Sequence, residues 1–207
     1  MTRGHQERRT IDGGPWSRKL ARVLRGWADE ALLDSYEAER RPIGTNNVLR
    51  SLSWDPVPAG ASLAWDVGVH YTSAVLNEAG SGAGQRAPHV RVRRGRSRIS
   101  TLDLFDGHLT VLTGPRGGPW CRATVELAAS GLPIVALSVG RDLSDEDGAF
   151  ARGYRVGDAG AVLVRPAGFI AWSHPGRVTD ARTALRSAVE HALGLAAAVP
   201  ANLRQAG

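Results

Sequence analysis

A hairpin signature near the C-terminal end of this 207-residue chain constrains its fold most. Two apolar four-residue runs, 161–164 and 169–172, flank the tetrapeptide RPAG at residues 165–168. Proline presets φ at the second position of a turn and glycine suits the fourth, so the pattern predicts two antiparallel strands. Strands this apolar must be covered, and we therefore expect a sheet with a hydrophobic core in this part of the chain.

Three further strands are predicted upstream of the hairpin. A basic strand spans His89–Arg94, and another spans His108–Thr113 after the turn at residues 99–107. Pro133–Val139 is a near-continuous apolar run, which is typical of a central strand buried on both faces. An acidic loop at residues 141–148 follows that run.

Two helices complete this region. Trp120–Ala129 has helical spacing, with Val125 in its apolar stripe and Gly131 suited to the position just after the helix end. An alanine-rich amphipathic helix is expected from Asp180 to Leu195, with Thr179 as its N-cap. The order of strands and helices is similar to that of a thioredoxin-like domain.

The N-terminal region is predicted to be helical. After Pro15, one apolar stripe with helical spacing is formed by Leu20, Val23, Leu24 and Trp27. A second helix is expected from Asp29 to Arg40, ending before Pro42 because a residue that precedes proline is pushed out of the α region. Pro42 is then expected to begin a third helix that runs to about residue 52.

These patterns predict an α/β fold with an N-terminal helical segment followed by a thioredoxin-like α/β domain. We expect a flexible N-terminus at residues 1–14, a helical segment at 15–54, a linker with short strands at 55–84 and the thioredoxin-like domain at 85–200. The glycine-rich residues 80–84 suggest the boundary before that domain.

Several of these segments resemble a known family in their order and spacing. Residues 23–28 (VLRGWA) and 32–42 (LLDSYEAERRP) are similar to the C-terminal helices of the flavin domain of FAD-dependent aromatic-ring monooxygenases, the phenol hydroxylase-like and polyketide hydroxylase-like enzymes. Residues 86–89 (RAPH), 109–114 (LTVLTG) and 162–172 (VLVRPAGFIAW) resemble the thioredoxin-like C-terminal domain of the same enzymes.

The resemblance implies a flavoprotein chemistry that uses FAD, NAD(P)H and oxygen to hydroxylate an aromatic ring. In the family, however, the 32–42 motif lies far downstream of the cofactor-binding motifs, and neither the G-x-G-x-x-G fingerprint nor the Gly-Asp motif is found in this sequence. We therefore expect a truncated or split member, inactive alone, that binds no FAD by itself. No catalytic residue is assigned, and the cofactor-binding residues stay unknown.

Two kinds of partner are left open by the sequence. One is a separate chain that carries the flavin domain, and the other is a second copy of this chain. Under either alternative the thioredoxin-like domain is a non-catalytic docking or dimerisation module. The substrate is not predicted, because the family's substrate contacts lie mostly in the part that this chain lacks.

The net charge of +6 comes almost entirely from arginine, since Lys19 is the only lysine. Most arginines are scattered among acids, and the densest cluster, at residues 91–98, has no interleaved aromatic residues for base stacking. We interpret this cluster as the solvated face of an edge strand and expect no specific nucleic-acid binding. No apolar run is long enough for a membrane span, so no membrane association and a cytoplasmic location are expected.

The single cysteine and the histidines give no strong site. Cys121 follows Pro119-Trp120, as the first cysteine of a thioredoxin motif does, but Thr124 stands where the second cysteine would be. Two-cysteine disulfide exchange is therefore excluded, and Cys121 is interpreted as structural, with a one-cysteine redox or sensor site as the alternative. The histidines lack metal-ligand spacing, so no metal site is predicted. Glu37 is expected to pair with Arg40 or Arg41 one helical turn away.

Overall fold

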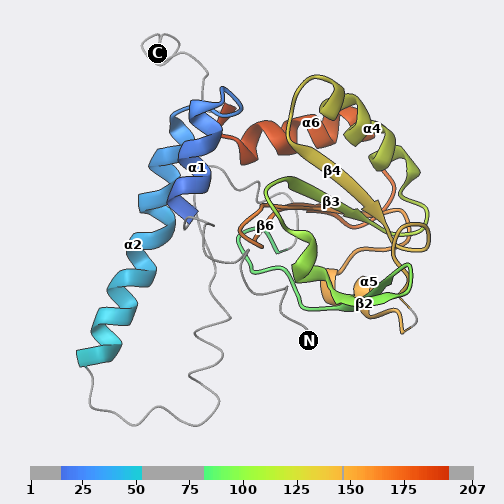
Figure 1. Ribbon diagram of the computed structural model, residues 1–207, viewed down its shortest axis with the longest axis horizontal. Coiled ribbons are helices and arrows are strands. Elements are labelled where there is room, and N and C mark those ends of the chain that lie inside the picture. The colour runs from blue at the N-terminus through green and yellow to red at the C-terminus, as the bar shows by residue number, and fades with distance from the viewer. Residues whose placement is uncertain (1–14, 53–81, 146, 196–207) are drawn as a thin grey trace, which may run out of the picture.

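The computed structural model describes residues 15–52, 82–145 and 147–195 (Figure 1). In chain order its elements are α1 (Pro15–Leu24), α2 (Ala31–Leu52), β1 (Arg91–Arg94), β2 (Ser97–Ser100), a 3-10 helix (Thr101–Leu104), β3 (Leu109–Thr113), α4 (Gly118–Ala129), β4 (Ile134–Ser138), α5 (Ala149–Tyr154), β5 (Ala161–Val164), β6 (Ile170–His174) and α6 (Ala181–Ala192).

The main sheet has four strands in the order β4-β3-β5-β6. β3 runs parallel to β4, with α4 as the crossover, and antiparallel to β5, which pairs with β6. A βαβ unit joined to a hairpin and a final helix is a thioredoxin-like arrangement. The predicted α/β fold, with a helical segment before a thioredoxin-like domain, is confirmed.

Each face of this sheet is covered by a different hydrophobic core, because neighbouring residues of a strand point to opposite faces. Val111 and Leu163 pack on the face covered by α4, α6 and the start of α2. Leu112 and Val162 pack on the other face, under the β1–β2 hairpin and α5. Figure 1 shows these layers, with α4 and α6 on one side of the sheet and β2 and α5 on the other.

The predicted hairpin is confirmed. β5 and β6 pair antiparallel, and the turn between them closes with a hydrogen bond from the Gly168 amide to the Arg165 carbonyl, at 2.8 Å. Gly168 has φ of +78°, a conformation that favours glycine. This turn reaches toward α1 and α2, and it therefore positions the site described below.

The prediction that Pro133–Val139 is a central strand is wrong. β4 lies at the edge of the sheet, and Val135 is 40% exposed. β3 and β5 occupy the centre instead, and all residues of both strands are buried. An apolar run indicates burial against neighbours, but it does not distinguish a strand between two others from an edge strand covered by a helix.

The region between residues 95 and 155 contains elements that the sequence did not predict. Residues 97–104 form β2 and a 3-10 helix, which Ser100 and Asp103 cap reciprocally, and α5 follows the acidic loop. Two details of the predicted helices are also wrong. Val125 is 69% exposed on α4, and Asp180, rather than Thr179, caps α6 by accepting a hydrogen bond from the Thr183 amide.

The N-terminal helices differ from the prediction at Pro42. α1 begins at Pro15 as expected, but α2 continues through Pro42 instead of breaking into two helices. A proline inside a helix costs the hydrogen bond to the carbonyl four residues earlier, here that of Ala38. Ala38 and Pro42 are both exposed, so water can reach the carbonyl that loses its partner.

Some predictions fall on residues that the structure does not describe. The flexible N-terminus at 1–14 and most of the 55–84 linker, with its short strands, lie outside the described residues. At the end of that linker, the Gly84 amide donates a hydrogen bond to the Ile170 carbonyl, at 2.8 Å. Among the described helices, none combines the length and apolar character needed to cross a membrane.

Candidate functional site

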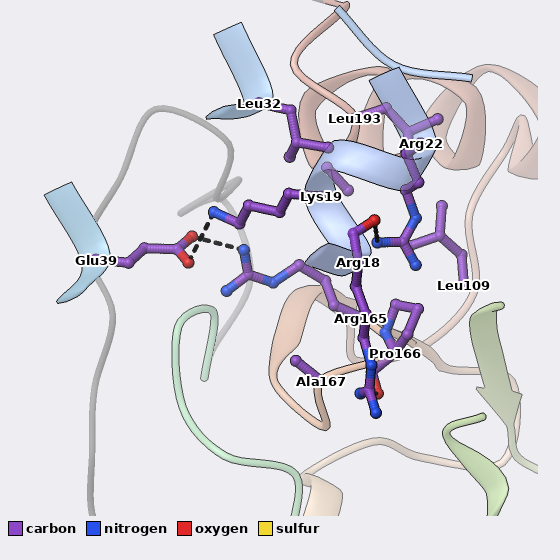
Figure 2. Close-up of a pocket in the computed structure, with 11 residues that line it drawn as sticks. Arg18, Lys19, Arg22, Leu32, Glu39, Leu109, Arg165, Pro166, Ala167 and Leu193 are labelled. Atoms are coloured by element: carbon purple, nitrogen blue, oxygen red, sulfur yellow. Dashed lines mark hydrogen bonds and ion pairs between the residues drawn. The ribbon is translucent and has the colours of Figure 1, made fainter. Parts of the chain in front are cut away.

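Four side chains from three distant elements form a buried ion cluster, which consists of Lys19, Ser35, Glu39 and Arg165. Glu39 on α2 accepts hydrogen bonds from Lys19 Nζ at 3.0 Å and from Arg165 Nη1 at 2.6 Å. Lys19 also donates to Ser35 Oγ at 2.5 Å. Figure 2 shows the Glu39 carboxylate facing both of its cationic partners, with a dashed line to each.

The local sequence explains why these side chains meet. Ser35 and Glu39 follow Leu32 at helical spacing, so all three lie on the buried stripe of α2. Lys19 lies on the α1 face that contacts α2. Arg165 is the first residue of the β5–β6 turn, and its side chain therefore reaches from the sheet to the helices.

Burial and charge compete within the ion cluster. The side chains of Lys19, Glu39 and Arg165 are 8%, 5% and 8% exposed. Burial alone would raise the pKa of the Glu39 carboxyl, but the attraction of Arg165 and Lys19 outweighs it and holds this pKa below its ordinary value. Burial lowers the pKa of Lys19, and the attraction of Glu39 offsets this effect only in part.

A small cavity of about 30 Å³ adjoins the ion cluster. Arg18 and Arg22 of α1 line it beside the cluster, and Arg18 Nη1 donates to the Pro166 carbonyl at 3.0 Å. The other walls are mostly apolar. The lining residues are Arg18, Lys19, Arg22, Leu32, Glu39, Leu109, Arg165, Pro166, Ala167, Ala192 and Leu193.

Arg22 carries the least compensated charge at this cavity. Burial, together with repulsion from Arg165, Arg18 and Arg25, lowers the pKa of Arg22 to about 10. Its hydrogen bonds go to two carbonyls, from Nη1 to Arg18 O at 3.3 Å and from Nη2 to Gly107 O at 3.4 Å. Among the described residues, no carboxylate lies within ion-pair distance of Arg22.

The arrangement is suited to joining elements and attracting anions rather than to covalent chemistry. Its serine hydroxyl donates to the Leu32 carbonyl at 2.6 Å. Lys19, the amine beside this hydroxyl, is a hydrogen-bond donor to it and is paired with Glu39, so it is not positioned as a free base. The site therefore holds the helical segment against the β5–β6 turn. Sequence reasoning missed it, although one signal was present, since a carboxylate on the apolar stripe of a helix requires a cationic partner.

The residues that the sequence singled out lie elsewhere and are not brought together. Cys121 is 8% exposed near the start of α4, and its Sγ lies 3.7 Å from Arg141 Nη2. Thr124 donates to the Trp120 carbonyl at 2.8 Å, within the same helix. Within the described ranges, no group of three or more His, Cys, Asp or Glu side chains is arranged to hold a metal ion.

The arginine-rich residues 91–98 form the β1–β2 hairpin. Val92 is buried, whereas Arg91 and Arg98 are exposed, which agrees with the interpretation of a solvated face. A groove of about 470 Å³ runs beside this hairpin, and Asp103 and Asp147 line it together with the arginines. The predicted helix-surface pair is also present, because Arg41 Nη1 lies 3.1 Å from Glu37 Oε1.

Comparison with known protein families gives two matches. Residues 81–196, more than half of the chain, match the family of the aromatic-ring hydroxylase C-terminal domain. Residues 13–51, which include α1 and most of α2, match an FAD-binding domain family. The ion cluster therefore joins residues of the second match, Lys19, Ser35 and Glu39, to Arg165 of the first.

Individual relatives agree with these families. The chain is 38% identical to a 4-methyl-5-nitrocatechol 5-monooxygenase from Burkholderia sp., over 84% of this chain and 38% of that protein. It is also 38% identical to the tetracenomycin A2 monooxygenase-dioxygenase of Streptomyces glaucescens, over 88% of this chain and 37% of the relative.

Solved structures show the same partial overlap. The aklavinone-11 hydroxylase, crystallised as a ternary complex with FAD and aklavinone, matches with a TM-score of 0.75 and 34% identity, over 85% of this chain and 38% of that one. The flavin-dependent monooxygenase PieE matches with a TM-score of 0.69 and 26% identity, over 86% and 42%. The chain thus spans about two fifths of the length of these relatives.

Proposed function

Since this chain belongs to the aromatic-ring hydroxylase family, we propose that it supplies the distal helices and the thioredoxin-like domain of an FAD-dependent hydroxylase. The family match over residues 81–196 supports the proposal most directly, together with the Glu39 ion pairs that attach α1 and α2 to that domain. The reaction would be NAD(P)H-dependent and oxygen-dependent hydroxylation of an aromatic ring. We assign no particular substrate.

The described residues do not fit FAD on their own. The match to the FAD-binding family is confined to residues 13–51, and the cavity that α1 and α2 line has a volume of only about 30 Å³. Pockets for small organic ligands usually have volumes of several hundred cubic ångströms, on the order of 300–1,000 Å³. We therefore derive no catalytic step through the flavin from these residues, and we propose that the chain alone is inactive.

The first test is flavin retention. The purified chain is mixed with FAD, passed over a desalting column and measured for flavin absorbance and for NADPH consumption. We expect no stoichiometric flavin and no NADPH oxidation above a buffer control. Flavin retained at one molecule per chain, with NADPH oxidation, would refute the proposal that this chain needs a flavin domain from elsewhere.

A docking role for a flavin-domain chain is the second candidate, and the exposed end of α2 favours it. Val48 and Leu49 are each 59% exposed on the half of α2 that extends away from the thioredoxin-like domain (Figure 1). Large apolar side chains exposed side by side indicate a contact surface. Because the neighbouring residues match an FAD-binding domain family, the occupant we propose is the remainder of such a domain.

Co-purification tests whether this chain docks onto a flavin-domain chain or acts without one. A tagged flavin-binding portion of a family member is co-expressed with this chain, either unchanged or carrying Val48→Ser and Leu49→Ser. We expect the double variant to lose co-purification while keeping its thermal stability. Val125→Ser, which removes an equally exposed apolar side chain from α4, serves as the control and should keep binding.

The remaining proposals concern location and other partners. We propose a cytoplasmic location and no specific nucleic-acid binding. A homodimer is the alternative to a flavin-domain partner, and light scattering of the purified chain distinguishes the two. If the chain binds DNA only through its net positive charge, binding should weaken steeply with salt and should not depend on sequence.

A further inference from the structure

The cavity beside the ion cluster is lined by more cationic than anionic side chains. Four cationic side chains, Arg18, Lys19, Arg22 and Arg165, line it together with one carboxylate, Glu39. Glu39 is already shared between Lys19 and Arg165. A half-buried cation that faces like charges is stabilised by a nearby anion.

Arg22 is the cation that most needs a counterion. Its two hydrogen bonds to carbonyls measure 3.3 and 3.4 Å, at the long end of the usual range. Its Nε is buried and has no acceptor among the described residues. A guanidinium in this condition gains more from an anionic acceptor than from a further neutral one, because the two opposite charges also attract each other.

The dimensions of the cavity restrict what can occupy it. Its volume of about 30 Å³ suits one or two water-sized particles, and its walls include Leu32, Leu109 and Leu193. A nucleotide is too large for this space, and a metal cation would add to the positive charge. Figure 2 shows the Arg22 guanidinium near Leu109, on the side of Arg18 away from Glu39.

We propose that this cavity binds one small monovalent anion of chloride size, which balances the charge of Arg22 with support from Arg18 and Arg165. The proposed anion site does not depend on the proposed hydroxylase function. Bound there, the anion stabilises the packing of α1 against the β5–β6 turn. Chloride is therefore a structural ligand of this chain.

Thermal unfolding in chloride and in gluconate, at equal sodium concentration, provides the first test. Gluconate is too large for the cavity and controls for ionic strength. If chloride binds with a dissociation constant of about 10 mM, then about 100 mM chloride should raise the Tm by about 3–6 °C relative to gluconate. Arg22→Gln should abolish this difference, whereas Arg186→Gln, at an exposed position on α6, should preserve it.

Bromide gives a direct readout that does not depend on any variant. Crystals of the unchanged chain grown in bromide should show one anomalous peak in the cavity, beside Arg22. Equal Tm values in chloride and gluconate, with no anomalous peak, would show that water fills the cavity and would overturn the proposal. An unchanged chloride response in folded Arg22→Gln would overturn it too. Because neither readout uses flavin or turnover, these outcomes are independent of the hydroxylase proposal.

Discussion

Replacing Glu39 by alanine should destabilise the chain far more than any surface substitution on the same helix. The change removes the one carboxylate that Lys19 and Arg165 share and leaves both cations buried. At an effective dielectric constant of about 20, a unit charge pair at these distances attracts by roughly 6 kcal/mol before desolvation is counted. Desolvation offsets much of this attraction, yet removing one partner of a buried pair still costs about 3–5 kcal/mol.

The matched control is Glu37→Ala. Glu37 lies two residues away on α2 and forms an exposed pair with Arg41, and such a pair contributes about 0.3–0.5 kcal/mol. Urea unfolding followed by tryptophan fluorescence gives both free energies of unfolding. For a chain of this size, a loss of about 3 kcal/mol should lower the Tm by roughly 6–12 °C.

The reasoning would be refuted if Glu39→Ala stayed within about 1 kcal/mol of Glu37→Ala, a difference smaller than removal of a buried ion-pair partner produces. A triple variant, Lys19→Met with Glu39→Leu and Arg165→Met, separates charge from packing. It removes all three charges while keeping similar volume, and we expect it to recover most of the lost stability, because apolar replacement of a buried ion cluster is often neutral.

Three further outcomes follow from the structure. The folded-state pKa of Glu39 lies below its ordinary value of 4.5, so the contribution of this carboxylate to stability is complete above pH 4.5 and is lost as the pH falls through the folded pKa. Glu39→Gln should therefore make the free energy of unfolding in urea depend less on pH in the acid range. Gly114→Ala should lower the free energy of unfolding by about 1–3 kcal/mol, because a Cβ there would lie 2.5 Å from the Asp158 carbonyl oxygen. Gly44→Ala, at an open position in a helix, should instead raise it by about 0.5–1 kcal/mol. Thermal unfolding compares the two variants. Cys121, being buried, should react with a thiol reagent such as DTNB much more slowly in the native chain than in urea, and equal rates would contradict its structural interpretation.

Local patterns predicted the elements whose residues carry their own signals. The turn at 165–168 could be predicted because proline and glycine each fit one position of it. The helix predicted from Trp120 to Ala129 followed from spacing, and Gly131, with φ of +90°, stands where a helix end requires it. The apolar stripe predicted for α1 is wrong in part, because Leu24 is 77% exposed and Trp27 follows the end of the helix.

Features that depend on distant residues could not be predicted in this way. The edge position of β4 is decided by which strands pair with β3, and no residue within β4 encodes that choice. The continuity of α2 through Pro42 depends on solvent access to the Ala38 carbonyl, which loses its helical hydrogen bond to the proline. Similarly, no residue of α2 near Glu39 indicates its partners, because its two buried partners come from other elements: Lys19 from α1 and Arg165 from the β5–β6 turn.

The contact between Glu39 and Arg165 joins residues 126 positions apart in the chain. Closing so long a loop costs conformational entropy and is therefore slow. We expect this contact to form only after the sheet and its helices have folded. An interaction that is absent from the folding transition state acts on the unfolding rate and leaves the folding rate almost unchanged. Loss of the carboxylate should therefore shorten the lifetime of the native state many-fold, while refolding after dilution from denaturant proceeds at nearly its original speed.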